Sequence, residues 1–408
     1  MRDWTITTIG EHCTVTSSKR FHLSERSDEG VPFYCSKEII QKVNGQEIGD
    51  CDYIREELYE QVKREFGVPE AGDLLITTRG TYGIPYIYQQ NDKFYFADGN
   101  LTWLKNFSND LLAEYLYYWV RSYEGQHKID AIAKGTAQKA VPIAGIKILQ
   151  FALPPVREQK RIVSILSAYD DLIVNNQKQI KLLEEAEQRL YKEWFVDLHF
   201  PGYEDVQIID GVPEGWQTGR ADDFFDITIG KTPPRSEKQW FVNGTEGVAW
   251  ASISDMGDAG TFMFNTSEGL TEDAIEKHNM KVVPAGTILL SFKLTLGRVS
   301  IVTRPMCTNE AIAHFRIVNP EEREYTYSYL KNFEYDTLGN TSSISKAVNS
   351  KIIKAMPFVI PTIEIMKAYS NLTAPIIDEI YNKQAQNIYL LEARDRLLPK
   401  IMSGEIEV

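Results

Sequence analysis

The chain has 408 residues, of which 43% are hydrophobic and 25% are charged, which is typical of a folded protein with more than one domain. This composition excludes a mainly disordered chain. No stretch approaches the roughly 18 apolar residues of a membrane helix. The formal net charge of −13 argues against a protein whose whole surface binds nucleic acid.

Targeting and redox signals are weak. The N-terminal MRDWTITTIG has no apolar signal region. The four cysteines form no C-x-x-C pair and fit a reduced, cytoplasmic chain: Cys13, Cys35, Cys51 and Cys307. No set of closely spaced ligands predicts a metal site, since His12 beside Cys13 is the nearest approach to one. We expect a cytoplasmic protein with no membrane partner.

The first region, residues 1–152, predicts short strands followed by a helix. Turn residues separate the apolar segments GDLLITT, IPYIYQQ and KFYFA, a pattern that indicates strands. From Asp110, DLLAEYLYYWVRSY carries apolar residues at three- and four-residue spacings and predicts a helix. No strand–helix alternation points to a parallel sheet, so we expect an α+β domain with a mainly antiparallel sheet.

Residues 153–199 predict a long amphipathic helix. Its apolar positions follow a heptad pattern, which calls for a partner helix and not a globular face. One seam position takes Leu166, Ile173, Ile180 and Trp194, and the other takes Ile162, Tyr169, Leu183 and Leu190. Asn176 and Glu187 interrupt the seam and are candidates for fixing the helix register.

The second half repeats this order. Residues 200–212 form a linker rich in Pro, Gly and acidic residues. In the second region, 213–358, TILLSFKLTLGRVSIV predicts two strands about a turn and EREYTYSYLKNF predicts a helix. Residues 359–408 predict a second helix, which Pro375 should start or kink with Thr373 as a cap.

The two halves are copies of one unit. Pro154 and Pro361 are 207 positions apart, and the same offset relates Lys139-Ala140-Val141 to Lys346-Ala347-Val348. GDLLI at Gly72 corresponds to GTILL at Gly286. We therefore expect a pseudo-two-fold internal repeat, in which two helices of about 65 Å pair as an antiparallel coiled coil between the two α+β domains. The C-terminal tail should then end near the start of the first region.

Two basic stretches occupy matching places in the copies. Residues 131–157 and 337–363 contain no Asp or Glu, although the chain as a whole is acidic. Lysines there could neutralise phosphates, and the alternative is a locally basic surface beside the start of a helix.

The whole chain resembles the DNA-specificity (S) subunit of Type I restriction–modification enzymes. The resemblance rests on LPPVREQKRIVSILSAYDDLI, LLEEAEQRLYKEWF, DGVPEGW and the C-terminal LLPKIMSGEI. GTAQKAVP at Gly135 resembles the segment before the family's helical regions, and RGTYG at Arg79 and KLTLG at Lys293 resemble its glycine turn between strands. The second copy departs from this pattern, because IPTIEIMKAY lacks the double proline and LGNTSSISKAV lacks the Thr-Ala-Gln.

The resemblance implies two target-recognition domains, each of which reads half of a bipartite site in double-stranded DNA. The helices would space the domains and dock methyltransferase (M) subunits, two being expected, and restriction (R) subunits are a further expected partner. The chain itself would hold no cofactor and catalyse nothing, since S-adenosylmethionine, ATP and Mg²⁺ would act on partner subunits.

Candidate DNA-binding residues follow from the basic stretches and the turns. They are Arg79, Lys134, Thr136, Gln138, Lys139, Lys147, Lys293, Arg298, Lys346, Lys351 and Lys354. A solvated surface charge is the alternative for each cation, and a helix cap is the alternative for Thr136 and Gln138. Trp194 and Phe195 are candidates for docking a partner, with the helical core as their alternative.

Motifs for catalysis are missing from the sequence. The double prolines at Pro154 and Pro233 lack the flanking residues of an adenine methyltransferase motif. Gly230-Lys231-Thr232 looks like the end of a phosphate loop, but Phe225 stands where that loop needs its first glycine. The alternatives to a DNA reader are a coiled-coil scaffold that has lost DNA binding and an enzyme that acts on DNA itself.

Overall fold

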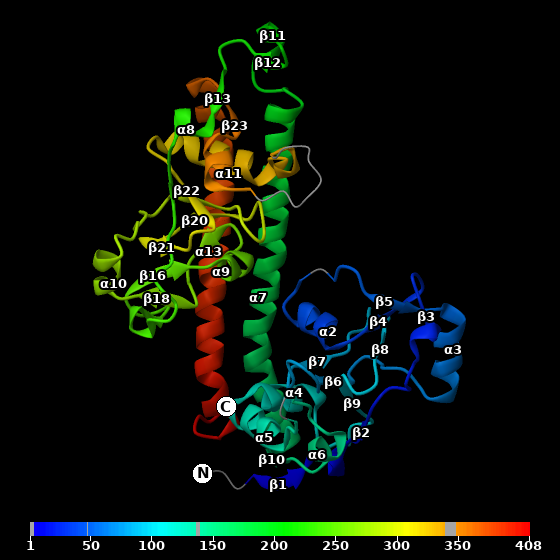
Figure 1. Cartoon of the computed structure of the whole chain (residues 1–408). Helices are drawn as coiled ribbons and strands as arrows, with labels where there is room; N and C mark the ends of the chain where they lie inside the picture. The colour runs from blue at the N-terminus through cyan, green and yellow to red at the C-terminus, as the bar shows by residue number, and fades with distance from the viewer. Residues whose placement is uncertain (1–3, 47, 136–138, 339–347) are drawn as a thin grey trace. The chain divides into compact units, whose positions relative to one another are not determined.

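The computed structural model describes residues 4–46, 48–135, 139–338 and 348–408. The chain forms two compact units, of which unit 1 comprises Met1–Asn175 and Asn387–Val408 and unit 2 comprises Asn176–Gln386. Two long helices, α7 (Val156–Tyr191) and α13 (Ile363–Met402), each contribute one segment to each unit (Figure 1). The finer domain limits expected from the sequence stay a prediction.

Unit 1 contains two four-stranded sheets, in the orders β2-β9-β6-β7 and β3-β5-β4-β8. Their pairings are antiparallel except that of β4 with β8. The strands are β2 (Thr14–Thr16), β3 (Arg26–Ser27), β4 (Val31–Tyr34), β5 (Asp52–Ile54), β6 (Leu74–Thr77), β7 (Pro85–Ile87), β8 (Tyr95–Phe96) and β9 (Leu101–Lys105). The strands predicted in GDLLITT, IPYIYQQ and KFYFA are thereby confirmed as β6, β7 and β8.

A two-stranded sheet and several short helices also belong to unit 1. The strands are β1 (Thr5–Thr8) and β10 (Gln150–Leu153), which brings the start of the chain beside the start of α7. The helices are α1 (Ile9–His12), α2 (Ser36–Val43), α3 (Glu56–Glu65), α4 (Ala113–Arg121), α5 (Tyr123–Ile132) and α6 (Ile143–Lys147). The helix predicted from Asp110 is α4, and it begins three residues later.

Unit 2 follows the same plan, with one additional strand in its larger sheet. A five-stranded sheet takes the order β14-β22-β19-β20-β17 and a four-stranded sheet the order β15-β18-β16-β21. The strands are β13 (Gln217–Arg220), β14 (Asp226–Ile229), β15 (Phe241–Asn243), β16 (Val248–Ala251), β17 (Phe262–Met263), β18 (Glu268–Leu270), β19 (Ile288–Ser291), β20 (Val299–Val302), β21 (Met306–Thr308), β22 (Ile312–Arg316) and β23 (Pro357–Ile360). The parallel pairs are β16 with β21 and β17 with β20.

The helices of unit 2 occupy the corresponding places. They are α8 (Ala221–Phe224), α9 (Ile253–Asp258), α10 (Glu272–Lys277), α11 (Arg323–Asn332) and α12 (Ser350–Lys354). The predicted strand pair and helix are confirmed as β19, β20 and α11. A short hairpin of β11 (Ile208–Ile209) and β12 (Val212–Pro213) lies at the predicted linker.

The internal repeat is confirmed element by element, even where the two sequences have diverged. Thr5 pairs with Leu153 in unit 1, and Gln217 pairs with Ile360 in unit 2. The strand order β2-β9-β6-β7 reappears as β14-β22-β19-β20. Because the buried positions of these strands can be filled by many apolar residues, the fold can persist after most side chains have changed.

The long helices pack against globular cores as well as against each other. In unit 1, Ile162 and Leu166 of α7 share a core with Leu398 and Ile401 of α13 and with Phe151 of β10. In unit 2, Tyr191 lies in one core with Met366 and Tyr369 of α13. Within each unit the α7 and α13 segments run antiparallel, as predicted. The expectation that the heptad pattern excludes a globular face was wrong, because the same positions serve both contacts.

Pro375 was expected to start or kink the second helix; a start at Pro375 was wrong, and a kink there stays a prediction. Helix α13 begins at Ile363 and continues through Pro375. The Thr373 hydroxyl donates to the Tyr369 carbonyl one turn earlier, so it does not cap a helix start. Pro375 lies on an exposed face, where water can satisfy the carbonyl that its missing N–H leaves without a donor.

Polar side chains interrupt the apolar contacts between the helices. The Asn176 amide donates to Gln386 Oε1 at 2.9 Å in unit 2, and Arg394 donates to Asp170 at 2.6 Å in unit 1. Glu187 is 2% exposed and accepts hydrogen bonds from the hydroxyls of Ser328 and Tyr369, the latter at 2.9 Å. Such groups are satisfied in one alignment of the helices only, which supports the register role expected of Asn176 and Glu187.

Glu187→Gln should stabilise unit 2 above neutral pH. Burial raises the pKa of Glu187, against the opposing effect of its two hydrogen bonds. The folded state therefore holds this proton more tightly than the unfolded chain, and stability falls as pH rises from about 4.3 through the raised value. Glutamine keeps an acceptor without the charge, so we expect thermal unfolding at pH 8 to shift upward by on the order of 2 °C.

The gain should vanish below pH 4, where the wild-type carboxyl is protonated in both states. Glu276→Gln, at an exposed position of α10, is the matched control and should change neither midpoint. A Glu187→Gln variant that is less stable at pH 8 would contradict this account.

Candidate nucleic-acid interface

Two equivalent hairpins stand out in the repeat. The first hairpin joins β6 to β7 through residues 78–84, and the second joins β19 to β20 through residues 292–298. Their strands pair in the same register, since Leu74 faces Ile87 and Ile288 faces Ile301, 214 positions later in each case. The glycine turns RGTYG and KLTLG thus occupy the same place in the two units.

The base of each hairpin is held by the same hydrogen bonds. In the first, the hydroxyl of Thr77 accepts from the Ile84 N–H at 2.9 Å, and the Gly83 N–H donates to the Thr77 carbonyl at 2.8 Å. In the second, Ser291 accepts from the Arg298 N–H and from the Gly297 N–H, both at 3.0 Å. Gly83 and Gly297 have φ values of 80° and 88°, which only glycine adopts without strain. The hairpin bases are rigid supports on which different tips are placed.

In unit 1 the basic stretch lies directly beside the first hairpin. Arg79 forms a β-bridge with Ala140, and the Val141 N–H donates to the Thr78 carbonyl at 2.8 Å. Lys134 pairs with Ala140 through two backbone hydrogen bonds. Arg79, which is distant in the sequence, is therefore brought to one exposed edge with Lys134 and Lys139.

One carboxylate organises this basic cluster. Asp130 accepts a hydrogen bond from the Tyr82 hydroxyl and forms an ion pair with Lys139 at 3.1 Å. The hydrogen bond from Tyr82 is the main reason that the pKa of Asp130 lies below its usual value, and Lys139 adds to the effect. Asp130 raises the pKa of Lys139 in turn. Lys139 is thus held beside Asp130, which offsets part of its charge, and its contact with a phosphate stays a prediction.

In unit 2 the structure separates two cations that the sequence placed together. Lys293 is exposed at the tip of the second hairpin. Arg298 is half-buried and donates from Nη1 to the Ile253 carbonyl of α9 at 2.6 Å. A side chain tied to α9 in this way braces the domain, whereas Lys293 faces solvent and is available to a ligand.

The remaining candidate cations lie on short helices. Lys147 ends α6 and lies against Gly10 of α1, while Lys351 and Lys354 lie on α12, which packs against α8. Thr136, Gln138 and Lys346 lie outside the described residues. DNA contact by each residue of this set stays a prediction.

Trp194 and Phe195 lie in a short π-helical segment, Lys192–Val196, that follows α7. Trp194 is 7% exposed, and the Phe195 ring meets the rings of Tyr325 and Tyr369 edge-on at 4.7 and 4.9 Å. Both side chains therefore pack in the aromatic core of unit 2, and docking of a partner by them stays a prediction.

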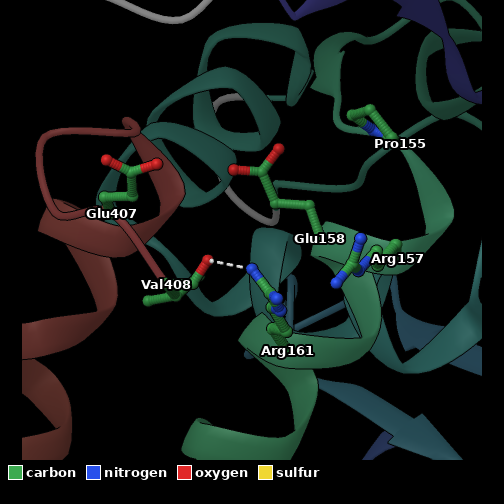
Figure 2. Close-up of a pocket in the computed structure, with 6 residues that line it drawn as sticks. All are labelled: Pro155, Arg157, Glu158, Arg161, Glu407 and Val408. Atoms are coloured by element: carbon green, nitrogen blue, oxygen red, sulfur yellow. Dashed lines mark hydrogen bonds between the residues drawn. The ribbon is translucent and has the colours of Figure 1, made fainter.

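The C-terminal tail returns to the start of α7, as expected. Figure 2 shows a pocket of about 300 Å³ in unit 1, in which Arg161 points toward the Val408 carbonyl and donates to it at 3.3 Å. Glu158, which also lines this pocket, accepts from the Trp4 indole N–H at 3.2 Å. Trp4 and Val408, which lie near the two ends of the chain, therefore both contact the N-terminal part of α7.

The buried titratable groups are held in unreactive forms. Burial raises the pKa of Cys13 and of Cys307 to about 12, so both remain thiols at neutral pH. Burial lowers the pKa of His314 to about 4, and its ring nitrogens bond the hydroxyls of Thr228 and Thr308. Within the described ranges, no three metal-ligating side chains come together. None of the helices placed there has the length and apolar character needed to cross a membrane.

One residue of the interface was missed by the sequence reading. Leu294, at the tip of the second hairpin, is 98% exposed and has a φ of 63°. Its signal was present in the repeat, because the equivalent residue 214 positions earlier is Gly80, whose φ is 73°. The two copies therefore differ at this position, which is glycine in the first and leucine in the second.

The fold defines a class of protein with two structurally equivalent domains. Each domain carries an equivalent hairpin, and the exposed residues of the two hairpins differ. A family model described as the type I restriction modification DNA specificity domain matches residues 1–185 and again residues 213–388. These matches cover most of the chain, which therefore belongs to this family.

Several relatives carry the same description. The chain is 26% identical over 357 residues to the Type I restriction enzyme MjaIX specificity subunit of Methanocaldococcus jannaschii, covering 83% of this chain and 78% of the relative. It is 23% identical over 406 residues to the Type I restriction enzyme HindI specificity subunit of Haemophilus influenzae, covering 82% and 86%. The crystal structure of a Type-I restriction-modification S subunit from M. genitalium shares the fold, with a TM-score of 0.57, 16% identity and coverage of 98% and 96%.

Replacing the two arginines separately should distinguish a brace from an exposed contact. Arg298→Ala leaves the Ile253 carbonyl without its charged donor and should lower the free energy of unfolding by ~2 kcal/mol. Arg79→Ala removes an exposed side chain and should change it by less than about 0.5 kcal/mol. Urea unfolding followed by circular dichroism measures both, and Lys293→Ala is the matched control in unit 2. Equal losses for the two arginine variants would contradict these roles.

Proposed function

We propose that this chain is the DNA-reading subunit of a Type I restriction–modification enzyme. Each unit reads one half of a bipartite site in double-stranded DNA through the tip of its hairpin and the basic stretch beside it. The observation that carries the proposal is the pair of hairpins, whose bases share two equivalent hydrogen bonds while their exposed tips differ. A β-hairpin fits the major groove, where the base edges are distinct.

The net negative charge is compatible with such a role, because contact with phosphates is then favourable only where Lys and Arg gather. The net charge of −13 disfavours general binding to nucleic acid. Arg79, Lys134 and Lys139 gather at the first hairpin, and Lys293 stands at the second. Cations at these edges favour a defined orientation on the duplex.

The helices supply the docking surface for partners in this proposal. Two methyltransferase subunits, and restriction subunits where the complex contains them, would bind α7 and α13. Both helices expose large apolar side chains, including Leu182 at 64% and Tyr389 at 70%, which is unusual on a helix that faces only water. The chain itself is non-catalytic, and S-adenosylmethionine, ATP and Mg²⁺ act on the partners. Four free cysteines fit action in the cytoplasm.

Mapping of methylated adenines tests the proposal most directly. The chain and its neighbouring methyltransferase subunit are co-expressed, and the modified adenines in the host DNA are sequenced. We expect methylation confined to one bipartite motif with a fixed gap, because two readers held by one pair of helices contact two half-sites at a set distance. A stable complex without any motif would favour the alternative, a scaffold that has lost DNA reading.

Lengthening both helices should change the gap and nothing else. Seven residues inserted into α7 after Asn175 and seven into α13 after Gln386 extend both helices where the two units divide. One heptad adds about 10 Å, so the gap should grow by about three base pairs. Methylation mapping reads this out, and insertion into α7 alone is the control that should disrupt the helix pairing. An unchanged gap would show that the helices do not set it.

A further inference from the structure

Leu294 forms the exposed tip of the second hairpin. The Thr295 N–H donates to the Lys293 carbonyl at 2.7 Å, which makes a three-residue γ-turn with Leu294 at its centre. With a φ of 63°, Leu294 adopts a conformation that residues with a β-carbon rarely take. Its side chain is 98% exposed, so no packing within the chain compensates for this conformation.

Folding alone does not account for a leucine here. A left-handed backbone disfavours leucine, and full exposure leaves its apolar surface in water. The first hairpin has Gly80 at the equivalent position with a similar φ, so the turn itself needs only glycine. An apolar side chain held outward at a strained position points to a function outside the chain.

The support below the tip holds this conformation in place. The buried Ser291 hydroxyl donates to the Thr295 carbonyl at 2.6 Å and accepts from the Arg298 N–H at 3.0 Å. The guanidinium of Arg298 is fixed in turn to the Ile253 carbonyl. The tip therefore presents Leu294 between Lys293 and Thr295 on a rigid base, as a specificity contact requires.

We propose that Leu294 is a specificity-determining residue that contacts the 5-methyl group of a thymine in the half-site read by unit 2. This inference rests on the proposed function. The thymine methyl is the apolar group on the major-groove edge of the base pairs, and aliphatic side chains are its natural partners. Lys293 beside it supplies a cation for a phosphate or a guanine edge. The first hairpin has Gly80 in this place, so unit 1 makes no corresponding contact and reads its half-site through other side chains.

Leu294→Gly tests the proposal, because it restores the residue of the other copy and relieves the strained turn. The variant should unfold at the same temperature as the wild type or higher. In complex with the methyltransferase subunit, it should bind a duplex carrying the mapped motif about tenfold more weakly. Val318→Ala is the matched control, since Val318 is 82% exposed and follows β22 at the end of the sheet opposite the hairpin. It should bind as the wild type does.

Replacement of single thymines by uracil identifies the contact. Uracil lacks only the methyl group, so at one position of the unit 2 half-site it should weaken the wild-type complex about as much as Leu294→Gly does. The same replacement should leave the variant complex unchanged. Wild-type-like binding by Leu294→Gly overturns the inference, and so does a loss that no uracil reproduces, which would indicate insertion between bases instead. Absence of any bipartite motif for the wild-type complex would overturn the proposed function itself.

Discussion

Each domain of this protein is completed by segments of both long helices, and the rest of the structure depends on that constraint. The core of unit 1 contains Ile162 from α7 and Ile401 from α13. The core of unit 2 contains Tyr191 and Tyr369 from the same two helices. Neither sheet region can bury its apolar face without residues from distant parts of the chain. The apolar contacts that stabilise a domain therefore also fix the helix pairing, so a change in either one is felt by the other.

Polar groups make this packing specific. Apolar seams tolerate a shift of one turn, whereas Asp170 with Arg394 and Asn176 with Gln386 must meet in one alignment. Arg121 and the Tyr118 hydroxyl also converge on Asp170, which ties the α4 helix to the helix pair. Buried polar contacts of this kind stabilise little beyond their desolvation cost, and their effect lies in excluding other registers.

The order of strands and helices could be predicted from the sequence, whereas the tertiary contacts of individual polar side chains could not. Strand β6 and helix α11 follow from local patterns, a short apolar run between turn residues for β6 and apolar spacing for α11. Pro375 misled because the rule for proline assumes a lost hydrogen bond in a helix interior, and here the lost bond faces solvent. Arg79 and Arg298 look alike in the sequence, and only the tertiary contact of Arg298 with Ile253 separates a solvent-facing cation from a brace. Such contacts join residues that no local pattern relates.

The division between hairpin base and tip explains how one fold can carry two readers. Thr77 and Ser291 perform the same backbone bonding, so the base constrains these residues closely. The tip residues are exposed, and their side chains can change from Arg79-Gly80 to Lys293-Leu294 without disturbing the core. Stability therefore restrains the base but restrains the tip weakly, apart from its preference for glycine at position 294. Leu294 departs from that preference at an exposed position, where the fold places little restriction on the side chain. A residue selected for contact with an external ligand is expected at such a position.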